Sequence, residues 1–157
     1  MTTCHQSRVP LAELDVLVVD REATGAAPDG HLLEIGWSRT DAAVTHTRLI
    51  KLPAGARPSP AVMRITGISD RMLRHGVDAE AAWLDLATEA ASVRQQPAPT
   101  VIHFARFERP LLRRVAGAEF PLDIVCTHEI ARRLLPDLPR RSLRALALRR
   151  RDGHPPP

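Results

Sequence analysis

The chain has 157 residues, of which 44% are hydrophobic and 25% charged, with a formal net charge of +4. These values are typical of one globular domain with a single core, and they argue against a wholly disordered chain. No stretch is apolar enough for a membrane span or a secretory signal, and two cysteines, Cys4 and Cys126, cannot build a disulfide framework, so we expect a cytoplasmic protein.

The first part of the chain predicts a small antiparallel sheet. After a lead-in at residues 1–12, the apolar run at 16–19 is typical of a strand covered on both faces. A turn at 25–30 follows, and residues 31–37 alternate between apolar and polar side chains as a strand does. A more polar strand at 44–52 is expected at an edge. Because the connections are short, we expect these three strands to form an antiparallel meander.

The remainder of the chain alternates between helices and strands. In chain order it predicts a short helix at 61–65 with a turn at Gly67, a helix at 79–93 with Asp78 as its N-cap, a strand at 100–102, a helix at 107–116 with Pro110 in its first turn, a strand at 123–126, and helices at 127–135 and 142–150, the last capped by Ser142. We therefore expect an α/β fold in one domain at 13–150, with a mixed sheet, parallel later strands and helices on both faces. The Pro-rich end at 151–157 is expected to be disordered.

The most informative feature is a pair of acids after the first apolar run. Asp20 and Glu22 lie two residues apart, so in a strand their side chains share a face while Arg21 points away. Two neighbouring carboxylates repel each other unless one is protonated or a cation lies between them. Their oxygen atoms suit Mg²⁺ or Mn²⁺. The alternative is a solvated turn in which both acids face water.

Basic residues are concentrated in the second part of the chain. Residues 94–157 carry 13 Lys and Arg against 6 Asp and Glu, whereas residues 1–93 carry 9 against 12. All of the basic residues except Lys51 are arginine, the side chain best suited to bidentate phosphate contacts. A polyanionic partner is one interpretation, with contacts from Arg132, Arg133, Arg140, Arg141 and Arg144. A basic face in contact with solvent is the other.

Several segments occur in an order that matches a known family. DREATG at 20–25 and LEIG at 33–36 come first, then RITGI at 64–68, HFARFE at 103–108, and the stretches at 126–136 and 142–146. Together they resemble the motifs of the DnaQ-like 3′–5′ exonucleases, the DEDD superfamily that includes polymerase proofreading subunits. The resemblance extends from about residue 14 to 148. It implies a ribonuclease H-like sheet and hydrolysis of terminal phosphodiester bonds with two Mg²⁺ or Mn²⁺ ions.

The same resemblance implies roles for individual residues. By analogy Asp20 bridges the two ions, Glu22 binds one of them, and Glu108 stands where the family has its second aspartate, which helps to hold the other ion. Thr24 and Gly25 correspond to positions where the backbone approaches the terminal nucleotide, although Gly25 is also an ordinary turn residue. His103 is either a substrate contact or a structural residue at a strand end.

The chain departs from the family pattern in two places. In the second motif, Phe104 replaces Asn and Glu108 replaces Asp. The third motif, a His with an Asp five residues later on a helix, is missing: His154 is the only late histidine, and prolines follow it. Losing a general base costs a rate factor of ~10²–10⁴. We therefore expect weak or absent activity. Three explanations are open: the chain is a fragment of an active exonuclease, it is a degenerate relative, or a partner completes its site.

Two functions are consistent with these observations. The first is a metal-dependent 3′–5′ exonuclease domain acting on single-stranded or 3′-terminal nucleic acid, DNA more than RNA, with a polymerase or another protein as a candidate partner. The second is a non-catalytic nucleic-acid-binding or protein-interaction module on the same fold. The intact Asp20 and Glu22 favour the enzyme, whereas the missing third motif favours the module.

Overall fold

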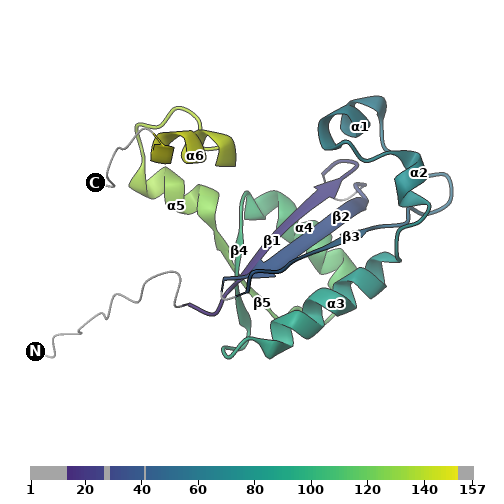
Figure 1. Ribbon diagram of the computed structural model, residues 1–157, viewed down its shortest axis with the longest axis horizontal. Helices are drawn as coiled ribbons and strands as arrows, with labels where there is room; N and C mark the ends of the chain where they lie inside the picture. Colours follow the sequence, from purple (N-terminus) through teal and green to yellow (C-terminus); the bar gives the residue numbers. More distant parts are fainter. Residues whose placement is uncertain (1–13, 27–28, 41, 152–157) are drawn as a thin grey trace, which may run out of the picture.

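A five-stranded mixed sheet organises the computed structural model, which describes residues 14–26, 29–40 and 42–151 (Figure 1). Its strands are β1 (Leu17–Ala23), β2 (Leu32–Arg39), β3 (Thr45–Leu49), β4 (Ala98–Ile102) and β5 (Leu122–Cys126), in the order β3-β2-β1-β4-β5. The antiparallel meander and the edge position of β3 are confirmed, as is the parallel arrangement of the later strands.

The meander is fixed by alternating side chains and by a closed hairpin. Val19 lies opposite Trp37, and both side chains are almost fully buried on one face of the sheet. Beyond the end of β1, the backbone N–H of Thr24 donates to the carbonyl of His31, and the hydroxyl of Thr24 accepts from the backbone N–H of His31, at 2.9 Å each. These bonds hold the ends of β1 and β2 together next to the predicted acids.

The other half of the sheet joins the meander through a short parallel contact. β1 pairs with β4 at Leu17 with Thr100 and at Val18 with Val101. β4 and β5 pair along their whole length, from Ala98 with Leu122 to Ile102 with Cys126. The narrow seam between β1 and β4 therefore connects a three-stranded antiparallel half to a two-stranded parallel half.

The helices are α1 (Pro60–Thr66), α2 (Asp70–Leu73), α3 (Ala79–Ser92), α4 (Ala105–Ala116), α5 (Thr127–Leu134) and α6 (Leu143–Arg151). Local chemistry explains the ends of α1: the Ser59 hydroxyl accepts from the backbone N–H of Val62, and Gly67 ends the helix with a positive φ of 74°. The Ser142 cap of α6 is confirmed by a 3.3 Å bond from the backbone N–H of Ala145. No helix in the described part of the chain is long and apolar enough to cross a membrane.

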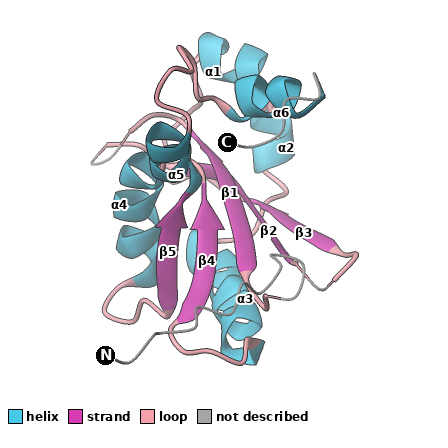
Figure 2. Cartoon of the chain, turned by 90° about the vertical axis from the view of Figure 1, so that its left-hand side faces the viewer, coloured by secondary structure: helices cyan, strands magenta, loops and turns pink. Residues whose placement is uncertain are grey.

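Helices α3 and α4 cover one face of the sheet. The core between them contains Leu17, Ile35, Leu86 and Leu112, each at most 1% exposed. A smaller cluster on the opposite face packs Leu33 of β2 against residues of the α1–α2 region. The described residues leave the rest of that face open, since Val18 and Val125 are both 40% exposed. In Figure 2 the arrowheads of β4 and β5 point to the end of the sheet where α5 lies.

The structure corrects several sequence-based boundaries. β1 continues through Ala23, so Asp20 and Glu22 lie within the strand instead of after it. β4 starts at Ala98 and contains Pro99, although we expected the prolines to precede the strand. α4 starts at Ala105, which places Pro110 inside the helix and not in its first turn.

Two further corrections concern helices. Asp78 occupies the N-cap position of α3, but its side chain makes no capping hydrogen bond. The one-turn helix α2, whose N-cap is Ser69, was not predicted because four residues are too few to show helical periodicity. The lead-in at 1–12 and most of the Pro-rich end at 151–157 lie outside the described residues, so those domain boundaries stay predictions.

Candidate active site

The paired acids lie on the open face of β1. Leu17 and Val19 are buried under α3 and α4, whereas Val18, Asp20 and Glu22 alternate with them and face the other way. Because β1 is parallel to β4 and β5, the two acids lie toward the carboxyl end of the parallel strands. In open α/β sheets this end is where ligands bind.

A third acid faces the pair from the neighbouring strand. Glu34 of β2 lies directly opposite Glu22 of β1 in the antiparallel register. Burial raises the pKa of Glu22, and the negative charges of Asp20 and then Glu34 raise it further, while Arg21 acts in the opposite direction. Within the described residues neither Asp20 nor Glu22 takes part in an ion pair. The open face therefore holds negative charge that a cation would stabilise.

Arg21 points to the opposite, covered face and contacts the first turn of α4. Its Nε lies 2.6 Å from Oε2 of Glu108, and one of its terminal nitrogens donates to the backbone carbonyl of Phe107 at 2.7 Å. The side chains of Arg21 and Glu108 are only 6% and 14% exposed. The Nε–Oε2 contact is an ion pair by distance without the geometry of a hydrogen bond. Glu108, the predicted third carboxylate, is thus engaged by a residue of the chain itself.

Burial dominates the protonation of this pair. It raises the pKa of Glu108 to about 7, because desolvation outweighs the opposing effect of the Arg21 charge, and Asp20 and Glu22 add to the increase. Burial also lowers the pKa of Arg21, against the effect of the three carboxylates. A guanidinium still keeps its proton at neutral pH, so the positive charge of Arg21 is permanent. The charge of Glu108 is the variable one.

His103 follows β4 and is held by the start of α5. Its Nδ1 lies 2.9 Å from the hydroxyl oxygen of Thr127, and its Nε2 is buried without a hydrogen-bond partner among the described residues. Burial lowers the pKa of His103, as does His128, while the backbone of Arg141 and the charge of Asp20 raise it. The ring of Phe104 stacks on His128 at 4.0 Å between centroids and meets the edge of His103. His103 is therefore a fixed imidazole for which the neutral form is favoured.

Thr24 and Gly25 follow β1 at the same end of the sheet. The Thr24 hydroxyl closes the hairpin by accepting from His31, and its own proton remains available for donation to another group. A Cβ added to Gly25 would meet no atom of the described residues within 4 Å. Internal packing thus gives no reason for glycine at position 25.

Not all of the predicted metal ligands converge. In the part of the chain that the structure describes, no group of three His, Cys, Asp or Glu side chains is close enough together to hold a metal ion. Asp20 and Glu22 share a face, whereas Glu108 pairs with Arg21. Sequence reasoning missed Glu34, which the register of β1 and β2 brings opposite Glu22, and it missed the contact of Arg21 with Glu108.

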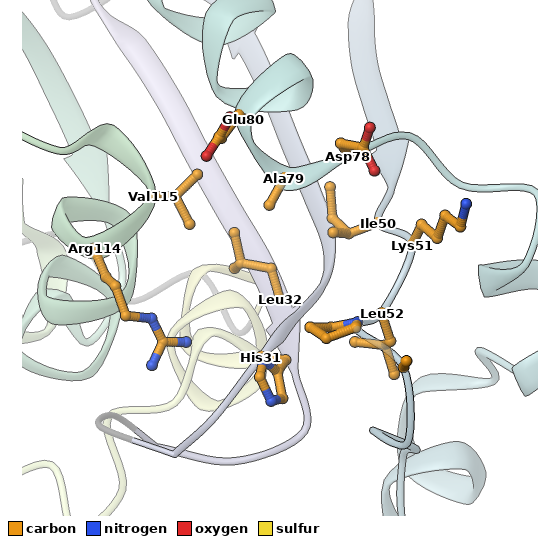
Figure 3. Close-up of a pocket in the computed structure, with 12 residues that line it drawn as sticks. His31, Leu32, Ile50, Lys51, Leu52, Asp78, Ala79, Glu80, Arg114 and Val115 are labelled. Atoms are coloured by element: carbon orange, nitrogen blue, oxygen red, sulfur yellow. The ribbon is translucent and has the colours of Figure 1, made fainter.

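A separate cavity of about 630 Å³ lies where β2 and the segment after β3 meet the start of α3 (Figure 3). Its lining includes His31, Lys51, Asp78, Glu80 and Arg114, and none of the predicted site residues. Charges of both signs surround it, which does not suit a phosphate group. The acids of β1 therefore remain the better candidate for chemistry.

Two of the arginines proposed for phosphate contacts already have partners within the chain. Arg132 pairs with Glu129 one turn earlier on α5, with a 3.0 Å contact. Arg141 donates to the backbone carbonyls of Leu135 and Pro136. The pairing of Arg132 is exposed to solvent and so weak that a phosphate could replace Glu129.

The sheet order, with three antiparallel strands followed by two parallel ones, defines a ribonuclease H-like fold of the exonuclease type. The RNase_T exonuclease family matches residues 17–155, and the chain therefore belongs to that family. The DnaQ-like resemblance of the sequence is thereby confirmed.

Solved structures agree with this fold. Exonuclease X in complex with 5′-overhanging duplex DNA is similar with a TM-score of 0.64 and 23% identity, over 90% of this chain and 78% of that one. Exonuclease I of E. coli in complex with an oligonucleotide has a TM-score of 0.71 and 16% identity, over 90% of this chain but 36% of that one. This chain thus spans about a third of exonuclease I. A comparison with curated protein sequences gives no match.

Proposed function

We propose that this chain is a metal-dependent 3′–5′ exonuclease domain that hydrolyses terminal phosphodiester bonds of nucleic acid, DNA more than RNA. The observation that carries the proposal is the pair Asp20 and Glu22, which share the open face of β1 without a cation partner among the described residues, in a chain of the exonuclease family. A protein that only binds nucleic acid has no need of such a repelling pair.

Asp20 and Glu22 fit a hard divalent cation. Both carry carboxylate oxygens on one face. Burial raises the pKa of Glu22, and the negative charges of Asp20 and Glu34, which a cation would offset, raise it further. When bound, Mg²⁺ or Mn²⁺ polarises the scissile phosphate and lowers the pKa of the attacking water. The arrangement with two ions predicted from the sequence needs Glu108 as a ligand, and therefore needs Arg21 to release it.

Other residues at this end of the sheet would position the substrate. We assign His103 to the nucleotide because it follows β4 at the end of the sheet toward which Asp20 and Glu22 lie. The free proton of the Thr24 hydroxyl and the open backbone at Gly25 would contact the terminal nucleotide. The absence of the third motif stays a prediction, because His154 lies outside the described residues. Without its general base we expect turnover lower by a factor of ~10²–10⁴.

A nuclease assay on single-stranded DNA labelled at its 5′ end tests the proposal. With Mn²⁺ present, the wild type should shorten the DNA from its 3′ end, and Asp20→Asn should abolish that shortening because it removes one anionic ligand. Asp123→Asn is the matched control, since Asp123 is an exposed carboxylate at the opposite end of the parallel strands. It should leave the rate unchanged.

The same assay separates the enzyme from a binding module. Chelation of the metal by EDTA should stop the shortening of DNA by the wild type. Asp20→Asn should give no shortening with or without EDTA. Binding of the DNA without shortening, equal in the wild type and Asp20→Asn, would instead identify a non-catalytic nucleic-acid-binding module. Parallel substrates of RNA and of double-stranded DNA would define the preferred nucleic acid.

A further inference from the structure

We infer that the guanidinium of Arg21 takes the place of a second cation at Glu108, so that this chain binds one divalent ion instead of two. The inference rests on the proposed cation site at Asp20 and Glu22, and it concerns what the chain does with its third carboxylate. Its basis is the contact between Arg21 and Glu108, for which the nuclease proposal has no use.

The contact is built into the fold at two points. Arg21 lies in β1 between the two acids, and its side chain crosses to the first turn of α4, where it meets Oε2 of Glu108 at 2.6 Å and the carbonyl of Phe107 at 2.7 Å. With 6% of its side chain exposed, Arg21 has little freedom to swing into solvent. The guanidinium is therefore fixed beside Glu108 by both a carboxylate and a backbone carbonyl.

Local charge explains why one ion is enough. On the covered side of β1, the negative charge of Glu108 is matched by the positive charge of Arg21. On the open side, Asp20, Glu22 and the facing Glu34 have no ion-pair partner among the described residues, so the demand for a cation is concentrated there. A second divalent ion at Glu108 would place two positive charges beside a buried guanidinium, and the repulsion between these like charges would weaken its binding.

Displacement of Arg21 is also unfavourable. Breaking a buried ion pair leaves an uncompensated charge out of contact with water, and this outcome is strongly destabilising. An ion that displaces Arg21 from Glu108 must therefore offset two costs: the unpaired buried charge of the guanidinium and the loss of the ion's own bound water. Arg21 thus determines the number of metal ions.

Counting bound Mn²⁺ tests the inference without any activity measurement. The free ion is titrated against the whole chain and followed by its electron paramagnetic resonance signal. We expect one bound Mn²⁺ per wild-type chain, and two in Arg21→Met, where Glu108 is released into a site without the competing charge. The double variant Arg21→Met, Glu108→Gln should return to one.

A variant in the wild-type background keeps the test independent of how well Arg21→Met folds. Glu108→Gln should still bind one Mn²⁺ with an affinity within about twofold of the wild type, because Glu108 holds no ion when Arg21 is present. Two ions in the wild type, or loss of the single ion in Glu108→Gln, would overturn the inference and leave the nuclease proposal intact. A single ion in a folded Arg21→Met would also overturn it. No bound ion in any variant, including the wild type, would overturn the proposed cation site itself.

Discussion

The backbone of Phe104 offers a test of strain next to the candidate site. Phe104 precedes α4 with a φ of 56° and a ψ of 41°, and it is the one described non-glycine residue with a positive φ. Only glycine, and to a lesser degree Asn and Asp, adopts this left-handed conformation without a penalty of about 1–2 kcal/mol. At this position Phe replaces the Asn of the DnaQ-like second motif that the sequence resembles. A residue that adopts the left-handed conformation at a cost therefore stands in place of one that adopts it more easily.

The ring contacts of Phe104 explain why the strain persists. Stacking on His128, with centroids 4.0 Å apart and an interplanar angle of 24°, stabilises the fold by about 0.5–1.5 kcal/mol beyond the area buried. Burial of part of the ring adds about another 1 kcal/mol. The contacts therefore outweigh the strain, and the wild type should be more stable than any variant that lacks the ring.

The two smallest replacements separate strain from contacts. Phe104→Ala and Phe104→Gly lose the same ring, but only glycine relieves the left-handed backbone. Glycine relieves about 1–2 kcal/mol of backbone strain but adds about 0.5–1 kcal/mol of entropy to the unfolded chain. At the middle of both ranges the Gly variant should be more stable than the Ala variant by about 0.8 kcal/mol.

Urea unfolding of both variants measures this difference directly. Leu84→Gly compared with Leu84→Ala, at an exposed position in the middle of α3, is the control, and there the glycine variant should be the less stable by about 0.5–1 kcal/mol. The reasoning is refuted if Phe104→Gly is no more stable than Phe104→Ala. That outcome would mean that residue 104 does not hold a left-handed backbone in solution.

Two other predictions concern residues of the candidate site. The carboxyl of Glu108 has a pKa of about 7 in the folded chain against 4.5 for the ordinary group, so the folded state binds more protons between these values and stability in metal-free buffer should fall as pH rises through this window. Urea midpoints across the window should fall less in Glu108→Gln, and an equal fall in both proteins would contradict the pKa assignment. Gly25→Ala should leave stability within about 0.5 kcal/mol of the wild type, since its Cβ meets nothing within 4 Å, while the KM for a DNA substrate should rise. An unchanged KM would remove Gly25 from the substrate site.

Much of the fold could be predicted because its elements depend on local patterns. The alternation of Leu33, Ile35 and Trp37 was sufficient to identify β2, and short connections were sufficient for the meander. The sequence also indicated that Asp20 and Glu22 share a face, because alternation within a strand requires it. Boundaries were less accurate where prolines were involved: Pro99 lies within β4 and Pro110 inside α4, although a residue without an N–H donor argues against both positions.

Contacts across the chain could not be predicted in this way. Alternation shows that Arg21 points away from the acids, but it does not show that α4 begins where Arg21 can reach it, 86 residues later at Phe107. Glu34 faces Glu22 only because of the hairpin register, and a shift of one residue would turn it to the other face. Both contacts depend on three-dimensional packing that no local pattern encodes.

The short pairing of β1 with β4 has a consequence for the chemistry as a whole. The acids of the open face belong to the antiparallel half of the sheet, whereas His103 and Glu108 follow β4 in the parallel half. Where the halves meet, Arg21 of β1 links them through its ion pair with Glu108 and its hydrogen bond to the carbonyl of Phe107, both in the first turn of α4. The spacing of the groups at the site therefore depends on this link as well as on the core that both halves share under α3 and α4.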